Sequence, residues 1–461
     1  MTSTSTLLSL EPRAVPPVET KHRRIRTSLP VPESIPILKK LQELEPQSMS
    51  GQPPILWDRA EGFNVYDAWG NKWIDWSSGV LVANAGHSHP KVVEAVRRQL
   101  DRPLMHTYCF PSEPRARLVE KLASLAPEGL DKVFLLTTGS EATECCIKLM
   151  RKHGAAVGGN GKLAIVTFVN GFHGRTMGSQ MAGGWPAQKE WIVNLDPAMV
   201  QVPYPDGFRQ ADTSFDVFLN SLAEQGLGPD QVAGVMLETY QGGSARFAPV
   251  DYIKRLAEWC DSHNIVLAFD EVQAGCGRTG KFWGFEHYGV TPDLIACGKG
   301  ISSGLPLSAV IGTPRLMDQF PPGSMTSTHT GNPICAAAAL AALEAIAEED
   351  MVSNAARIGE ILDDELSRLQ AKHGAAAGPI GAADAKGAVA TLQMVEPGTT
   401  TPHPTFAAEI VRGAIDRGVL MFSPVGTGGG TVKISPPLMT PEDALREALG
   451  VLTAACAEAL S

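Results

Sequence analysis

The chain has 461 residues, of which 44% are hydrophobic, and it carries a formal net charge of −10, which allows a large core and two or three domains. An acidic chain whose most basic cluster is Lys21–Arg26 argues against a nucleic-acid partner, and no apolar run reaches the roughly 18 residues that span a membrane. The eight cysteines show no C-x-x-C spacing, which argues against a disulfide framework or a metal site and favours a reducing, cytoplasmic location.

The N-terminal part is predicted to be a flexible tail followed by an antiparallel meander. Residues 1–35 are rich in Pro, Ser and Thr, which is typical of a poorly ordered segment. A short helix is expected next, and turn residues then separate three short strands, Ile55–Asp58, Asn64–Asp67 and Lys72–Asp75. We assign residues 36–75 to a smaller domain.

From residue 76 onward, helical and strand patterns alternate. Helices are expected over Pro90–Leu100, Arg115–Leu125 and Ser140–His153, with 154–161 as a flexible connector. Strands are expected over Lys132–Thr137, Leu163–Phe168, Gly234–Glu238, Ile265–Asp270, Leu294–Lys299 and Ser308–Gly312. This alternation predicts an α/β fold, a mostly parallel central sheet flanked by helices.

The large domain is expected to span residues 76–335. Residues 336–461 are expected to form the rest of a smaller α+β domain, built from both chain ends. This part opens with an Ala-rich helix over Ala336–Glu349 and includes a Gly/Ala-rich loop over 374–387.

Two of the predicted strands end in opposite charges. Ile265–Phe269 is followed by Asp270, and Leu294–Cys297 is followed closely by Lys299. Ligands of open α/β sheets bind outside the carboxyl ends of the strands, so both side chains are placed to face one ligand. A desolvated lysine is a nucleophile suited to a Schiff base, and an aspartate suits a protonated ring nitrogen, as in pyridoxal phosphate. The pair alone is equally compatible with a salt bridge across a crevice.

The segment Gly275–Lys281 has the glycine and lysine spacing of a nucleotide-binding P-loop. The next residue is Phe282, so the hydroxyl that binds magnesium is missing, and the following residues have weak helical character. An NTPase therefore remains only a competing hypothesis from a different class of protein.

Two further motifs fit the ends of a phosphorylated ring. Gly139 and Ser140 stand between a predicted strand and a helix, where amides and a hydroxyl bind phosphate, although Ser140 could simply cap the helix. Phe172 could stack on a flat ring and Arg175 could hold a carboxylate, although they could equally be a core residue and a surface ion pair.

Together these stretches resemble the class III (ω-amino acid) aminotransferases, which are fold-type I pyridoxal phosphate enzymes. The likeness spans about residues 50–350 and continues more weakly to the end. It is carried, in order, by DAWGNKWIDWSSG, NAGHSHPKVVEAV, TTGSEATE, FVNGFHGRT, DEVQAGCGRTGKFWGFEHYGVTPD, the Lys299 segment and GNPICAAAALAALEAI.

The resemblance implies a role for each matching residue around the cofactor ring. Lys299 would form the Schiff base and move the substrate proton, and Asp270 would hold the ring nitrogen. Gln273 would contact the phenolic oxygen, and Phe172 would stack on the ring with His173 close by.

The remaining positions concern the phosphate and the substrate. Gly139 and Ser140 would bind the phosphate, and Thr328 would reach the phosphate of a neighbouring subunit, which implies at least a homodimer. The resemblance adds Glu238 as a cofactor contact and implies three substrate contacts, Arg175, Val80 and Lys433.

The sequence departs from the family pattern at positions that concern the substrate. Gly243 stands where relatives that use 2-oxoglutarate have a gating glutamate, and Lys433 stands where an arginine grips an α-carboxylate. Cys276 replaces a phenylalanine that is common in its loop. Pyruvate or another monocarboxylate acceptor is therefore favoured over 2-oxoglutarate.

The activity implied by the resemblance is transfer of an amino group from an ω-amino acid or similar amine to a keto acid. An amino-acid racemase or epimerase is the nearest alternative, and a dialkylglycine-type decarboxylase is the next, because the cofactor supplies the same electron sink to all three.

Overall fold

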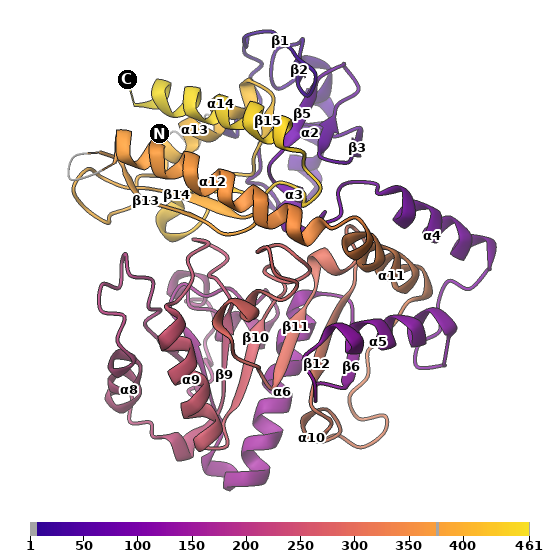
Figure 1. The fold of residues 1–461 in the computed structure, drawn as a ribbon, viewed down its shortest axis with the longest axis vertical. Helices are drawn as coiled ribbons and strands as arrows, with labels where there is room; N and C mark the ends of the chain where they lie inside the picture. Colours follow the sequence, from indigo (N-terminus) through magenta and orange to yellow (C-terminus); the bar gives the residue numbers. More distant parts are fainter. Residues whose placement is uncertain (1–6, 375–377, 461) are drawn as a thin grey trace. The chain divides into compact units, whose positions relative to one another are not determined.

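The computed structural model describes residues 7–374 and 378–460, and the chain divides into two units. One unit is Pro90–Val352, and the other is formed by the two chain ends, up to His89 and from Ser353 onward. Figure 1 labels the helices and strands of both. Among the described helices, none combines the length and the apolar character needed to cross a membrane.

The unit Pro90–Val352 is built on a sheet that, in its described residues, has seven strands. Their order is β6 (Lys132–Leu136), β12 (Ser308–Gly312), β11 (Leu294–Cys297), β10 (Val266–Asp270), β9 (Val232–Glu238), β7 (Ala164–Phe168) and β8 (Met199–Val202). Only β12 runs antiparallel to its neighbours within this described sheet. The predicted mostly parallel sheet is therefore confirmed, and β8 is a strand that the sequence pattern did not predict.

Helices connect and cover these strands. They are α4 (Pro90–Asp101), α5 (Glu113–Leu125), α6 (Gly139–Gly158), α7 (Met177–Ala182), α8 (Phe215–Glu224), α9 (Val250–Ser262), α10 (Pro314–Met317) and α11 (Pro333–Glu348), with short 3-10 turns η3 (Gly159–Gly161), η4 (Pro186–Gln188), η5 (Pro229–Gln231), η6 (Gly284–Tyr288) and η7 (Lys299–Ile301).

Helix α6 supplies the centre of the core of this unit. Its apolar residues Cys145, Cys146, Leu149 and Met150 pack with apolar residues of β9, β10 and β11. The helix continues to Gly158, so the connector expected over 154–161 is mostly helical. Gly154 serves close packing there, because an added Cβ would lie 2.1 Å from the carbonyl oxygen of Lys162.

Strand alternation decides which face of the sheet carries each side chain. In β10, Val266 and Ala268 belong to the core under α6, whereas the ring of Phe269 meets those of Phe285 and Tyr288. Because successive side chains alternate, Asp270 is on the same face as Ala268, the face that α6 covers. The strand end therefore presents its carboxylate toward the N-terminal turn of α6.

The unit formed by the chain ends contains two sheets in its described residues. The first has the order β1 (Val18–Glu19), β2 (Arg24–Ile25), β5 (Lys72–Asp75), β4 (Asn64–Tyr66) and β3 (Arg59–Glu61), with β15 (Val419–Leu420) parallel to β5. The second is antiparallel and consists of β13 (Ile380–Ala385), β14 (Ala390–Met394) and β16 (Thr431–Ile434). The antiparallel meander β3–β4–β5 agrees with the predicted meander, but the predicted first strand Ile55–Asp58 is wrong, because β3 covers Arg59–Glu61 and shares no residue with it.

The helices of this unit come mainly from the C-terminal part of the chain. They are α2 (Ile35–Leu44), the single turn α3 (Ser78–Leu81), α12 (Met351–His373), α13 (Pro404–Asp416) and α14 (Glu442–Ala459), with short 3-10 turns η1 (Pro32–Ser34), η2 (Gln47–Met49) and η9 (Thr427–Gly429). The loop expected over 374–387 contains β13, and its residues 375–377 lie outside the described residues.

The expected flexible tail over 1–35 does not hold for residues 7–35. Ile25 is 1% exposed in β2, and Arg23 Nε lies 2.6 Å from Glu447 Oε1 of α14. Local composition suggested disorder because the packing partners of this segment are distant along the chain: Asn64, Asn71 and Lys72 lie 42 to 51 residues further on, and Glu447 lies 424 residues further on. Residues 1–6 of the expected tail lie outside the described residues.

The observed unit boundaries also differ from the expected 76–335 and 336–461. Residues 76–89 belong with the chain ends, because Trp76 N donates to Leu420 O at 2.8 Å and Leu438 N donates to Asn84 O at 2.9 Å. Helix α11 belongs with the middle of the chain, because it packs against α4 and α5.

Packing of the N-terminal segment is testable by a core truncation. Ile25→Ala removes buried methylene groups and should lower stability by about 2–5 kcal/mol, measured as a lower midpoint of chemical unfolding. Lys40→Ala on the exposed side of α2 is the control and should leave the midpoint nearly unchanged. Equal midpoints for both variants would mean that the segment does not pack as described.

Candidate active site

A cavity of about 180 Å³ lies at the carboxyl ends of the strands in the unit Pro90–Val352. Parallel sheets place ligand sites at this edge. The cavity brings together most of the site residues predicted from the sequence, and its lining consists of Gly139, Ser140, Phe172, His173, Gly174, Arg175, Glu238, Asp270, Val272, Gln273 and Lys299.

Asp270 ends β10 and both of its carboxylate oxygens have partners. Oδ1 accepts a hydrogen bond from Val272 N at 3.1 Å, and Oδ2 lies 2.8 Å from Nδ1 of the buried His173. Burial alone would lower the pKa of His173, but the hydrogen bond and charge of Asp270 raise it above its usual value. His173 is therefore held against Asp270 Oδ2 inside the site.

Lys299 follows β11 and reaches the same cavity by a break in strand alternation. Leu294 and Ala296 face the core under α6, so continued alternation would turn residue 299 to the opposite face. Lys299 has φ +42°, in the left-handed region, and begins the turn η7. Burial lowers the pKa of its amine, while the charges of Asp270 and Glu238 oppose that shift.

Glu238 ends β9 and joins two loops of the cavity. Its Oε2 accepts a hydrogen bond from Phe172 N at 2.9 Å, and its Oε1 accepts one from Gly242 N at 2.7 Å. Burial raises the pKa of Glu238 to about 7, although the neighbouring His173 acts in the opposite direction.

The phosphate end of the predicted site is the first turn of α6. Thr138 is the N-cap, because its side chain accepts from Glu141 N in a capping box, so Ser140 is not the cap. The Ser140 hydroxyl faces the cavity and accepts a hydrogen bond from Arg175 N at 3.1 Å. A hydroxyl beside helix-terminal amides is suited to a phosphate group.

The ring end is the segment 169–176 between β7 and α7, which we call the ring loop. Phe172 is 37% exposed and lines the cavity, so it is not a core residue. The guanidinium carbon of Arg175 lies 5.1 Å from the Phe172 ring centroid, and its Nη1 donates to Gln188 Oε1 at 2.7 Å. Both side chains are therefore at the cavity wall, with a cation next to an aromatic face.

Three predicted residues lie elsewhere. Thr328 is exposed on the unit Pro90–Val352 and is not part of the cavity lining. Val80 and Lys433 belong to the unit formed by the chain ends. Val80 is 44% exposed and has φ +65°, and Lys433 is 2% exposed in β16.

Two lining residues were not predicted from the sequence, Val272 and Gly174. Gly174 has φ +134°, and an added Cβ would lie 2.3 Å from Ser140 Oγ, so only glycine lets the ring loop approach α6. The glycine at position 174, directly before Arg175, is the one sequence signal that could have indicated the close approach of the ring loop to Ser140.

The P-loop-like segment Gly275–Lys281 does not form a nucleotide site. It follows β10 through turns in which Gly277 N donates to Phe282 O at 3.0 Å, and the next regular element is the short turn η6. A P-loop passes directly from a strand into a helix, so this geometry does not support the NTPase hypothesis.

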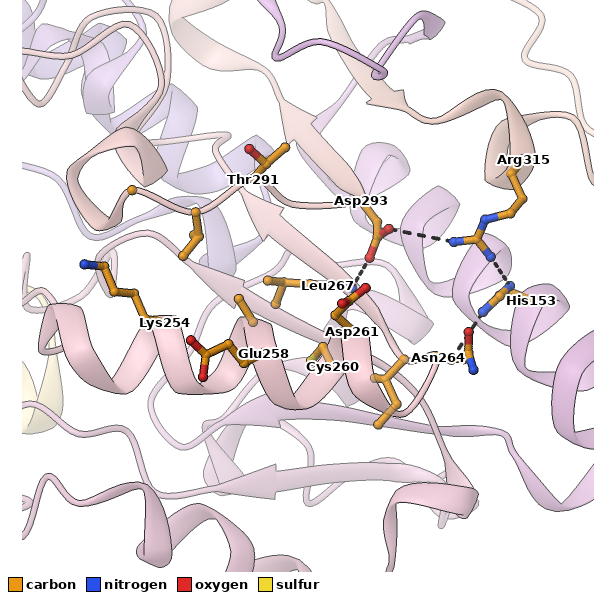
Figure 2. Close-up of a pocket in the computed structure, with 14 residues that line it drawn as sticks. His153, Lys254, Glu258, Cys260, Asp261, Asn264, Leu267, Thr291, Asp293 and Arg315 are labelled. Atoms are coloured by element: carbon orange, nitrogen blue, oxygen red, sulfur yellow. Dashed lines mark hydrogen bonds and ion pairs between the residues drawn. The ribbon is translucent and has the colours of Figure 1, made fainter.

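A larger cavity, of about 460 Å³, lies at the opposite ends of β10 and β11 (Figure 2). Within it, Arg315 Nη1 lies 3.1 Å from His153 Nδ1 and Nη2 lies 3.9 Å from Asp293 Oδ1, while Asp293 Oδ2 accepts from Leu267 N at 2.9 Å. Its lining includes neither Lys299 nor Asp270, the amine and the carboxylate of the predicted chemistry.

Comparison with known proteins identifies the family. The family model for aminotransferase class-III matches residues 47–456. The 5-aminovalerate aminotransferase DavT of Pseudomonas putida is 36% identical over 411 residues, covering 87% of this chain and 92% of the relative. The isoleucine 2-epimerase of Lentilactobacillus buchneri is 34% identical over 412 residues, covering 86% of this chain and 89% of the relative.

A solved structure agrees with this assignment. An amine transaminase from an uncultivated Pseudomonas species, in its PLP-bound form, superposes with a TM-score of 0.80 at 28% identity, covering 90% of this chain and 96% of the other. This chain belongs to the class III aminotransferases and is a pyridoxal phosphate-dependent transaminase of fold-type I.

The lining of the cavity fits pyridoxal phosphate in its chemistry. It presents an amine, a carboxylate, a partly exposed aromatic ring and a hydroxyl at a helix N-terminus. A Cβ on Gly139 would lie 2.8 Å from Val272 Cγ1, so the wall at the phosphate end is bare backbone there. These groups match the amine, ring nitrogen, ring face and phosphate contacts that such a cofactor needs.

The lowered pKa of Lys299 has a measurable consequence in the apoprotein. Because burial favours the neutral amine, competitive labelling with acetic anhydride should reach its midpoint at Lys299 below the ordinary lysine value of 10.5. Asp270→Asn removes a negative charge that favours the ammonium ion, so the midpoint should fall further. Peptide mass spectrometry measures both, and a midpoint at or above 10.5 in the wild type would contradict the burial.

Proposed function

We propose that the chain transfers an amino group from an ω-amino acid or a related primary amine to a keto acid, with Lys299 as the covalent anchor of the cofactor. The observation that carries the proposal is that Lys299 and Asp270, from neighbouring strand ends, line one cavity with Ser140 and Phe172. When bound there, pyridoxal phosphate supplies the electron sink for breaking a bond at the amine-bearing carbon.

Each cavity residue has a task that its position supports. Lys299 would hold the cofactor through its amine, whose pKa burial lowers, and would accept the proton from the substrate carbon. Asp270, which is hydrogen-bonded to His173, would contact the ring nitrogen. Gln273, next to Asp270 in the lining, is assigned to the phenolic oxygen.

The remaining contacts hold the cofactor in place. Gly139 and Ser140 bind its phosphate at the start of α6. Phe172 stacks on the ring, and Glu238 supports that ring contact through its hydrogen bond to Phe172 N.

The donor is proposed to carry a carboxylate far from its amine. Arg175 supports this, because its guanidinium stands at the cavity wall beside Phe172 and its plane suits a carboxylate. Val80 and Lys433 remain proposed substrate contacts. Since Gly243 has no side chain to act as a gate, the proposed acceptor is pyruvate or another monocarboxylate.

The active form is proposed to be a homodimer in which Thr328 contacts the phosphate of the neighbouring site. Thr328 is exposed, and Asn332 of its segment donates from Nδ2 to Met105 O at 2.8 Å. Two apolar side chains near this contact along the chain are exposed, Met105 at 60% and Phe110 at 75%. Exposed apolar side chains support an interface there.

A cytoplasmic location is also proposed. All eight cysteines lie in described residues and are free thiols, which is the usage expected in a reducing compartment.

The central assignment is testable by spectroscopy and kinetics of Lys299→Ala. The wild-type holoenzyme should have an absorption band in the near-visible that shifts when an ω-amino acid is added without a keto acid. Lys299→Ala should lose this absorption band, and its kcat should fall at least about 10³-fold, because the substitution removes both the nucleophile and the base. A Lys299→Ala variant that keeps both the absorption band and the wild-type kcat would contradict the assignment.

The same donor experiment separates a transaminase from an epimerase, an activity named for one relative. For this purpose an enantiopure α-chiral amine donor replaces the ω-amino acid, and its conversion into stoichiometric carbonyl product supports amino transfer. Loss of optical activity without keto product would favour epimerisation.

The role of Arg175 is testable by comparing two donors. Arg175→Ala should raise KM for an ω-amino acid by about 10- to 100-fold, because a charge-assisted contact is lost. KM for a simple amine without a carboxylate, such as n-butylamine, should change little. Equal effects on both donors would show that Arg175 does not bind the carboxylate.

A further inference from the structure

A carboxylate outside the cavity connects the two halves of the cofactor site. Glu144 lies on α6 one turn after Ser140. Its Oε1 accepts hydrogen bonds from Thr176 Oγ1 at 2.6 Å, Gly178 N at 2.8 Å and Ser179 N at 3.1 Å. These donors stand where the ring loop passes into α7, so Glu144 holds the end of the ring loop against the helix that begins the phosphate site.

Two neighbours of Glu144 on α6 hold the middle of the same loop. The Thr143 hydroxyl donates to His173 O at 2.7 Å, and Ser140 Oγ accepts from Arg175 N at 3.1 Å. The ring loop has neither helix nor strand of its own. The side chains of α6 therefore hold the second half of the loop, while Glu238 of β9 holds it at Phe172 N.

The contact at Glu144 is sterically specific. An added Cβ on Gly178 would lie 2.3 Å from Glu144 Oε2, so a side chain at that position would displace the carboxylate. The start of α7 is not capped by its own N-cap residue, because the Thr176 side chain makes no capping bond. A residue from another helix thus satisfies the exposed amides of α7.

We propose that Glu144 is a positioning residue that sets the ring loop, and with it Phe172 and Arg175, at a fixed distance from the phosphate contact at Ser140. The inference rests on the proposed function, because it takes Ser140 as the phosphate contact and Phe172 as the ring contact. A loop displaced by about 1 Å is enough to weaken the hold on a bound ring. Loss of Glu144 loosens the ring and leaves the link at Lys299 intact.

The test compares Glu144→Asp, Glu144→Gln and the control Glu258→Gln, an exposed residue of α9. Three quantities are measured: the Kd of the apoenzyme for pyridoxal phosphate, the visible circular dichroism of the bound cofactor, and the unfolding temperature of the apoenzyme. Glu144→Asp is one methylene too short to reach α7, so its Kd should rise about tenfold and its dichroic band should weaken. Its near-visible absorption band should persist.

Glu144→Gln keeps one acceptor oxygen, so its Kd and its dichroic band should lie between those of Glu144→Asp and the wild type. The Kd and the dichroic band of Glu258→Gln should match those of the wild type. Thr176→Val removes one donor to Glu144 and should weaken the dichroic band even if Glu144→Asp fails to fold.

A Kd within twofold of wild type together with unchanged dichroism, in Glu144→Asp or in Thr176→Val, would overturn the proposal. So would a lower unfolding temperature with unchanged dichroism, which indicates a purely structural role. Absence of cofactor binding by the wild type would instead refute the proposed function, so the two failures are distinguishable.

Discussion

The structure depends most on burying groups of opposite charge at the ends of adjacent parallel strands. The amine is that of Lys299, and the carboxylates are those of Asp270 and Glu238. Asp270 pairs in register with Ala296, and Lys299 follows only three residues later. Taking such charges out of water is costly unless each finds partners. Asp270 finds them in Val272 and His173, while the amine of Lys299 responds with a lowered pKa. Burial thus favours the neutral form of the Lys299 amine, which is its nucleophilic form.

The fold places further groups around this pair by simple geometric rules. Alternation along β9 and β10 presents Glu238 and Asp270 on the face that α6 covers. Helix α6 begins at the same edge, because β6 feeds directly into it, so its N-terminal amides and Ser140 meet the carboxylates across the cavity. One central helix therefore packs the core along its length and presents the proposed phosphate contact at its N-terminus.

The sequence predicted the parts of the structure that depend on local patterns. The apolar runs that end in Asp270 and near Lys299 are strands because buried parallel strands need uninterrupted apolar residues, and the site follows from where such strands end. The motif around Phe172 left two readings open, and the family likeness decided between them and brought in Gln273, whose role no local pattern indicates.

Features that depend on distant partners could not be predicted in this way. The segment 7–35 looked disordered because it has no partner nearby in sequence: it packs on β5 and on α13 and α14 at the far end of the chain. Glu144 was missed because nothing in its neighbourhood along the sequence shows that Thr176 and Gly178 approach it. The Ala-rich sequence of helix α11 does not indicate that this helix belongs to the unit Pro90–Val352.

The most direct test of the central claim is reduction of the holoenzyme with sodium borohydride, followed by proteolysis and mass spectrometry of the peptides. Reduction fixes the cofactor on the amine that binds it, so a single pyridoxyl group is expected on the peptide that contains Lys299. A pyridoxyl group on another lysine, such as Lys281 of the P-loop-like segment, would contradict the account.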